Sequence, residues 1–169
     1  MARRPSSGSI VAFTVLAAAV AWFAYIQFFN EERAIRNRMN EVAAALSTSR
    51  EASDLARLSR VMQLRRYLAE DVTAADQGSI ELRSRDEVMA VVAGAATGGD
   101  GVTATFVDLT VSIAPDGPTA QSRFRAELTG LDPLTRAPRL EVREVMADLE
   151  KRDGEWIITA VRARRPPTE

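Results

Sequence analysis

Few side chains in this 169-residue chain could do chemistry, because the sequence contains no histidine and no cysteine. The lack of histidine excludes a Ser-His-Asp triad, imidazole general bases and histidine-ligated zinc or haem. The lack of cysteine excludes thiol nucleophiles, iron–sulfur ligation and disulfides. Catalysis would therefore depend on Asp, Glu, Tyr, Arg or Lys151, the single lysine. The acidic residues do not have the spacing of a calcium-binding loop, so we expect neither a metal nor a cofactor.

The charge and composition describe a nearly neutral protein. The 22 basic and 23 acidic residues give a net charge of −1, whereas nucleic-acid binding normally requires a basic face. Hydrophobic residues make up 46% of the chain and charged residues 27%, which suits one compact domain. We therefore expect no nucleic-acid partner.

The strongest local signal is an apolar run over residues 10–29 (IVAFTVLAAAVAWFAYIQFF), which follows Arg3 and Arg4. A helix of about 20 apolar residues is long enough to cross the bilayer core. We predict a short tail (residues 1–9), a single transmembrane helix (10–29), a soluble domain (30–165) and a C-terminal tail (166–169). The basic N-terminal tail should stay in the cytoplasm, so we expect an inner (cell) membrane protein with a periplasmic or extracytoplasmic domain.

A cleaved signal peptide is the alternative interpretation of the same segment. Arg3 and Arg4 would form its basic region, and Ala19-Val20-Ala21 would be a small-x-small cleavage site. The apolar run continues past Ala21 to Phe29, however, and cleavage would leave that apolar end on a soluble protein. We therefore favour an uncleaved anchor.

Helical periodicity dominates the first part of the soluble domain. Apolar residues at intervals of three and four predict a helix over residues 31–46 and a second helix from Ser53 or Asp54 to Leu68. The second helix should present a wide apolar face formed by Leu55, Leu58, Val61, Met62, Leu64 and Leu68. Residues 69–79 look irregular and lead to a short strand at 80–82. A capping box at 84–87 begins a third helix, whose predicted inward residues are Val88, Val91, Val92 and Ala95.

The periodicity then changes to two, which predicts strands. Val107, Leu109, Val111 and Ile113 alternate with polar residues, and Ser122, Phe124, Ala126 and Leu128 do the same after a turn at 115–117. Arg123, Arg125 and Arg143, with Glu127 and Glu141, should form a mixed-charge outer face. A change of alternation after Val142 predicts a β-bulge near Arg143 and Glu144. A turn at Asp153-Gly154 precedes the final strand.

This order of elements resembles the nuclear transport factor two-like superfamily, also described as the SnoaL-like or cystatin-like cone. Residues 66–72 (RYLAEDV), 84–88 (SRDEV) and 153–158 (DGEWII) resemble the family's local motifs over roughly residues 31–163. The resemblance implies an α+β fold in which three helices pack on a curved antiparallel sheet. Since the family includes both enzymes and non-enzymatic proteins, the fold alone does not give the function.

The resemblance also supplies weak candidates for a site. Asp71 matches a position where ketosteroid-isomerase-like members have a general base, and Tyr67 could be a pocket hydroxyl. Such a base needs a closed apolar pocket and an oxyanion donor, and an exposed carboxylate at a helix end is the simpler interpretation. Phe106, Phe124 and Trp156 are candidates for lining the cone, with ordinary core packing as the alternative.

The final strand is apolar on both sides, which predicts a surface that needs a cover. If Trp156 and Ile158 face the core, Ile157, Val161 and Ala163 should form an interface. We therefore expect a membrane-anchored, non-enzymatic accessory or scaffold subunit that docks onto other membrane-complex subunits or forms a homo-oligomer. The alternative is a membrane-tethered binding protein, or a lyase- or isomerase-like enzyme, that holds a small lipophilic ligand in the cone.

Overall fold

A computed structural model describes residues 30–48, 52–77, 80–97, 101–115, 117–131 and 137–167. The chain divides into two units, Met1–Ala34 and Ile35–Glu169; of the first, the structure describes residues 30–34, which are helical. No helix in the described part of the chain combines the length and the hydropathy needed to span a bilayer. The transmembrane helix predicted at residues 10–29 lies outside the described residues.

The helices begin close to where the periodicity predicts them, but the second α-helix ends at Met62 and not at Leu68 as predicted. The first covers residues 30–46, and its predicted apolar stripe is confirmed, with Ile35 and Met39 fully buried. Helix α2 (Asp54–Met62) starts at Ser53, whose Oγ accepts a hydrogen bond from the Ala56 N–H at 3.3 Å. A 3₁₀ turn, η1 (Gln63–Tyr67), follows it. Helix α3 (Arg85–Thr97) starts at the predicted capping box.

In that capping box, the Ser84 hydroxyl accepts from the Glu87 N–H at 3.3 Å. The Glu87 carboxylate accepts from the N–H of Arg83 at 2.7 Å, one residue earlier than in the usual arrangement. Side chains therefore satisfy one free backbone donor of the first helical turn, that of Glu87, and one that precedes the helix, that of Arg83.

The predicted inward faces of the second and third helices are partly wrong. On α2, Leu55 and Met62 are 77% and 50% exposed, and the residues that are buried are Arg57 and Val61. On α3, Met89 and Ala96 are buried, whereas Val91 is exposed. The buried face of each helix is narrower than its apolar stripe, so an apolar residue at the edge of the stripe stays exposed to water.

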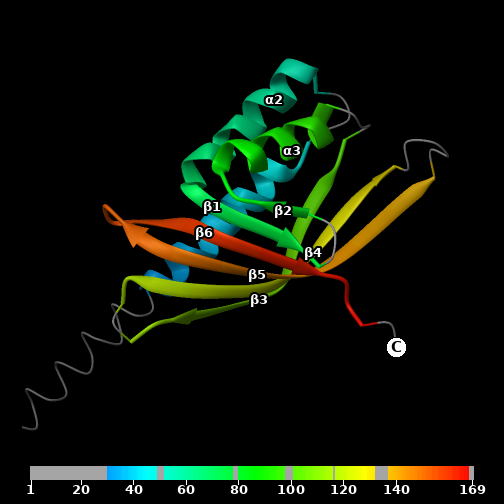
Figure 1. The fold of residues 1–169 in the computed structure, drawn as a ribbon. Coiled ribbons are helices and arrows are strands. Elements are labelled where there is room, and N and C mark those ends of the chain that lie inside the picture. Colours follow the sequence, from blue (N-terminus) through cyan, green and yellow to red (C-terminus); the bar gives the residue numbers. More distant parts are fainter. Residues whose placement is uncertain are drawn as a thin grey trace, which may run out of the picture. The chain divides into compact units, whose positions relative to one another are not determined.

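The sheet has six strands in the order β2-β1-β6-β5-β4-β3 (Figure 1). Strand β1 (Leu68–Asp76) pairs parallel with β6 (Glu155–Arg164) and antiparallel with β2 (Ile80–Leu82). The predicted antiparallel sheet is therefore mixed. Strand β1 occupies a stretch that was predicted to be irregular. Its residues do not alternate regularly, because the pairing of β1 with β6 shifts between Leu68 and Thr73.

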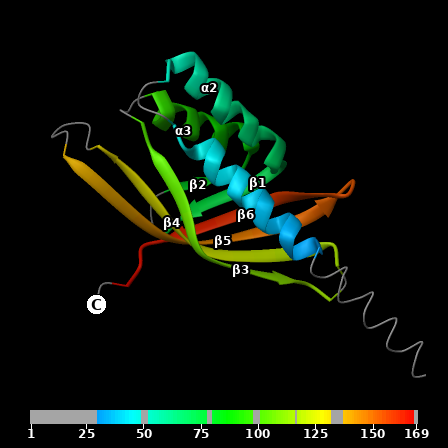
Figure 2. The ribbon, with the colours of Figure 1, turned by 180° about the vertical axis from the view of Figure 1, so that it is seen from behind.

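Strands β3 (Thr103–Ile113), β4 (Thr119–Leu131), β5 (Pro138–Arg152) and β6 form an antiparallel meander. The sheet's inner face packs on the helices, and its outer face is turned away from them (Figures 1 and 2). The predicted alternation of β4 is confirmed: Ser122, Phe124 and Ala126 are buried, and Arg123 and Arg125 are exposed. Strand β3 has a bulge at Asp108, with φ of 56°, so Val107 does not share the inner face with Leu109.

The β-bulge predicted in β5 near Arg143 and Glu144 is wrong. Strands β4 and β5 pair without a shift from Thr119↔Glu150 to Leu131↔Pro138, and the shift in the β5–β6 pairing leaves Thr159 of β6 as the extra residue. The hydroxyl of Thr159 donates to the backbone oxygen of Asp148 at 3.2 Å, which stabilises this bulge.

The buried residues of the helices and of the sheet form one core cluster. It contains Ile35 and Met39 from the first helix, Val61 from α2 and Val72 from β1, packed against inner-face residues of the sheet. The largest of those are Phe124, Leu149, Trp156 and Ile158. Figure 2 shows residues 35–46 of the first helix (cyan) lying across the strands.

Candidate functional site

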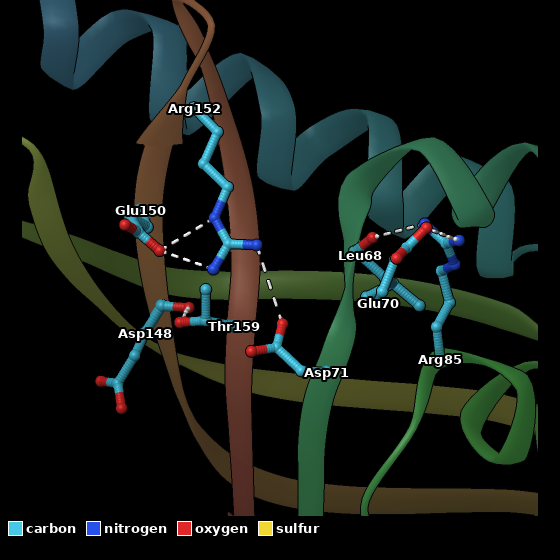
Figure 3. Close-up of polar contacts among 8 residues, drawn as sticks. All are labelled: Leu68, Glu70, Asp71, Arg85, Asp148, Glu150, Arg152 and Thr159. Atoms are coloured by element: carbon cyan, nitrogen blue, oxygen red, sulfur yellow. Dashed lines mark hydrogen bonds and ion pairs between the residues drawn. The ribbon is translucent and has the colours of Figure 1, made fainter.

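Asp71, the candidate general base, lies at the irregular part of β1. Its carboxylate is 79% exposed and is 3.7 Å from Nη1 of Arg152. Glu70, the neighbouring acid, is directed to a different partner, Nη2 of Arg85, at 3.1 Å (Figure 3). The shift in the β1–β6 pairing thus places two successive carboxylates in water, each beside an arginine.

Arg152 is the centre of a small ion-pair cluster. Its Nε and Nη2 donate to Oε2 of Glu150 at 2.9 and 2.7 Å (Figure 3). The hydrogen bonds to Glu150, and to a smaller extent the charge of Asp71, raise the pKa of the Arg152 guanidinium. A carboxylate that is open to water and paired with a guanidinium lacks the enclosed apolar pocket that a general base of this type requires.

Tyr67 has different surroundings from Asp71. Its side chain is 5% exposed and belongs to the core cluster. The guanidinium carbons of Arg38 and Arg66 lie 4.9 and 5.4 Å from its ring centre, which is the geometry of cation–π contacts. The two catalytic candidates therefore do not form one site: the tyrosine is in the core, and the acid is at the surface.

The three aromatic candidates for a ligand cavity are in the core. Phe106 and Phe124 stack with their ring centres 4.3 Å apart, and Phe124 and Trp156 are 7% and 2% exposed. Their neighbours in the cluster are aliphatic side chains of the helices and strands. Phe124 and Trp156 are therefore members of the core cluster, and Phe106 packs against it.

A cluster of charged groups lies on the helix side of the sheet, at the end away from the β5–β6 turn. Arg143 is 2.5 Å from Oε1 of Glu141 and 3.9 Å from Oδ2 of Asp76, and its side chain is 18% exposed. The pairing of Arg143 with Ala126 places it on the inner face, so the prediction that Glu141 and Arg143 belong to the outer face is wrong. Its two acidic neighbours balance its charge.

The outer face carries a hollow, which we call the arginine groove. It has a volume of about 480 Å³ and lies over β4, β5 and β6 with one edge on β3. Its lining residues include Arg123, Arg125, Arg162 and Arg164, together with Asp108, Thr110, Glu144 and Met146. Sequence reasoning found the two arginines of β4 and missed those of β6, although Arg162 and Arg164 have the same spacing of two.

Three of the four arginines in the groove are paired with acids of neighbouring strands. Arg125 lies 3.1 Å from Asp108, Arg164 lies 2.6 Å from Glu144, and Arg162 contacts Asp148. The bulge in β3 positions Asp108 for its pair, because the extra residue turns that side chain to the outer face.

Arg123 differs from the other three arginines. Its Nε and Nη2 donate to Oε1 of Gln121 at 3.1 and 2.9 Å, and that amide donates in turn to Oδ1 of Asp148 at 3.0 Å. Since an amide carries no charge, this contact orients the guanidinium without neutralising it.

The three interface candidates of β6 do not share one face. Val161 is opposite Ala147, a buried inner-face residue, and Ala163 is opposite Val145, whereas Ile157 is opposite Glu150 on the other side of the strand. The bulge at Thr159 causes this difference, because it reverses the alternation between Ile157 and Val161. Ile157 and Val161 both pack against the core, and their role in an interface stays a prediction. Among the described residues, no group of three or more acidic side chains is arranged to hold a metal ion.

Solved structures of three bacterial proteins have the same architecture. A nuclear-transport-factor-two-like protein with a cystatin-like fold from Novosphingobium aromaticivorans gives a TM-score of 0.70 at 13% identity, over 88% of this chain and 90% of that one. A candidate scytalone dehydratase from the same organism gives 0.69 at 17% identity, over 83% and 87%. A candidate aromatic ring hydroxylase, also from that organism, gives 0.67 at 12% identity, over 83% and 92%.

Comparison of the sequence with family models and with curated proteins finds no match. The likeness is therefore one of structure, and at these identities it establishes the fold alone. The helices and the six-stranded sheet of the described residues agree with the expected α+β architecture, except that β1 and β6 pair in parallel. The chain has a nuclear-transport-factor-two-like, cystatin-like α+β fold.

Proposed function

We propose that this protein is a membrane-anchored, non-enzymatic accessory subunit whose domain binds another protein through the outer face of its sheet. The observation that carries the proposal is the contrast between the two faces. The inner face is occupied by the core cluster, whereas the outer face has an open groove lined by charged side chains.

The membrane part of the proposal rests on the sequence. Residues 10–29 have the length and hydropathy of a transmembrane helix, and the basic residues before them favour a cytoplasmic N-terminus. Alkaline phosphatase fused after Thr168 should be active, because the domain would be outside the cytoplasm. A fusion that is inactive, together with a cytoplasmic reporter that is active at the same position, would overturn this orientation.

Charge reversal tests the docking face. The double variant Arg125→Glu and Arg164→Glu changes two exposed groove residues and should leave the core intact. The full chain, purified in mild detergent, should lose its co-purifying partner, identified by mass spectrometry of the wild-type sample. Arg139→Glu is the matched control, since Arg139 is exposed but is not a groove residue. A folded double variant that retains every wild-type partner would refute the proposal.

The alternative function is a membrane-tethered binding protein, or a lyase- or isomerase-like enzyme, with a lipophilic ligand in the cone. The names of two structural neighbours, a candidate scytalone dehydratase and a candidate aromatic ring hydroxylase, favour it. Against it, the chain has no histidine, which the resemblance to scytalone dehydratases would require, and Tyr67 and Asp71 lie in separate environments. A panel of lipophilic compounds that raises the melting temperature of the wild type would support this alternative.

A further inference from the structure

The arginine groove has a regular construction that indicates the shape of its ligand. Arg123 and Arg125 on β4 are two residues apart, and Arg162 and Arg164 on β6 repeat that spacing. Arg123 and Arg162 are both registered with Met146 of β5, and Arg125 and Arg164 are both registered with Glu144. Two rows of arginine therefore run along the outer face, one on each side of β5.

The dimensions of a β-sheet give the separation of these rows. Neighbouring strands are about 4.8 Å apart, so β4 and β6 are separated by about 10 Å, and residues two apart along a strand are separated by about 6.7 Å. An extended peptide lying over β5 has side chains that alternate between its two sides at the same spacing. Acidic side chains of such a peptide could reach both rows.

The charge of the groove favours an acidic ligand. Its four arginines face three carboxylates, Asp108, Glu144 and Asp148, which leaves one positive charge in excess. That excess is located at Arg123, whose partner is the neutral amide of Gln121. A carboxylate can accept two parallel hydrogen bonds from a guanidinium, which is a stronger interaction than the amide contact it would replace.

We propose that the arginine groove binds an extended, acidic segment of a partner protein, with one carboxylate of the segment on Arg123. This inference rests on the proposed function, because it specifies what the outer face recognises. The paired arginines Arg125, Arg162 and Arg164 position the segment by its charge, and Met146 supplies an apolar contact between the two rows.

Binding of model peptides tests this proposal on the full chain in detergent micelles. A fluorescein-labelled polyglutamate peptide should bind, and its affinity should fall as salt is raised, because exposed charges are screened. Polyglutamine of the same length should not bind. Arg123→Gln should weaken polyglutamate binding about tenfold, whereas Arg139→Gln, an exposed arginine that is not a lining residue of the groove, should retain it.

Each contrary result has a distinct meaning. Equal affinities of the wild type and a normally melting Arg123→Gln variant for polyglutamate would overturn the proposal. Inorganic phosphate that competes as well as the peptide would also overturn it, by revealing a general anion site. If polyglutamate does not bind but the Arg125→Glu and Arg164→Glu variant still loses its co-purifying partner, the docking function survives and the acidic segment is refuted.

Discussion

The two faces of strand β4 differ in what their side chains do, although they belong to one backbone. Ser122, Phe124 and Ala126 are buried against the helices, while Arg123 and Arg125 alternate with them on the outer face. The inner residues contribute burial, and the outer residues contribute ion pairs that are individually worth about 0–1 kcal/mol. The outer face can therefore change its charges with little effect on folding, which is a useful property for a recognition surface.

The largest effect should come from the inner face of β4. Phe124→Ala removes a buried ring that stacks on Phe106, and it should reduce the free energy of unfolding by about 3–5 kcal/mol. Arg125→Ala, the adjacent outer-face change, should cost less than about 1 kcal/mol. Urea denaturation of both variants measures the difference, and similar losses would remove the contrast between the faces.

A smaller effect is expected from the two half-buried residues of β6. Replacing Ile157 and Val161 together by Ser should lower the free energy of unfolding by about 2–3 kcal/mol, because both side chains pack against the core. Thermal or urea denaturation can measure it. Unchanged stability combined with loss of a binding partner would show instead that these residues form an interface.

A glycine in the turn between β5 and β6 tests whether that turn requires a positive φ. Gly154 has φ of +85°, which residues with a Cβ rarely adopt, so Gly154→Ala should cost about 1 kcal/mol although the surrounding space is open. Gly94→Ala is a matched control in α3, where the space is also open. There the same change should stabilise by about 0.5–1 kcal/mol, since alanine favours a helix. Equal effects at both sites would contradict a requirement for positive φ.

The smallest effect should be that of Arg152→Gln at the Glu150 and Asp71 cluster. Pairing raises the pKa of Arg152, so its contribution is present below the ordinary arginine pKa and is lost only as the pH rises through the higher folded-state pKa. The small difference in melting temperature between wild type and variant should therefore stay constant between about pH 7 and 10. A difference that disappears within this range would show that another group titrates at the cluster.

Elements whose buried and exposed residues follow one regular spacing could be predicted from the sequence. The alternation in β4, the stripe of the first helix and the capping box at Ser84 are local patterns, and the structure confirms each. Strand β1 was not recognised, because Glu70 and Asp71 both point into water and interrupt the alternation. Its parallel pairing with β6 joins residues far apart in the sequence, which a local pattern cannot reveal.

The error about the bulge has a related cause. Leu140 and Val142 lie on the outer side of β5, whereas Glu141 and Arg143 lie on the inner side at that end of the strand. The apolar residues of β5 therefore move from one face to the other although the strand has no bulge there. The reason is that the core ends at this point, so the inner face is no longer apolar. Of the four arginines of the arginine groove, the two on β4 could be predicted from the sequence. The two on β6 could not, because that required knowing that β6 lies beside β5.

The position of β6 also has a consequence for the order in which the chain folds. This strand comes last among the strands in the sequence, yet it lies between β1 and β5 and joins them into one sheet. During synthesis, β1 emerges long before β6, so it can pair with β2 but cannot complete the hydrogen bonding of its other edge until β6 has been made. The domain should therefore complete its sheet late, and until then its unpaired apolar strands are exposed to aggregation.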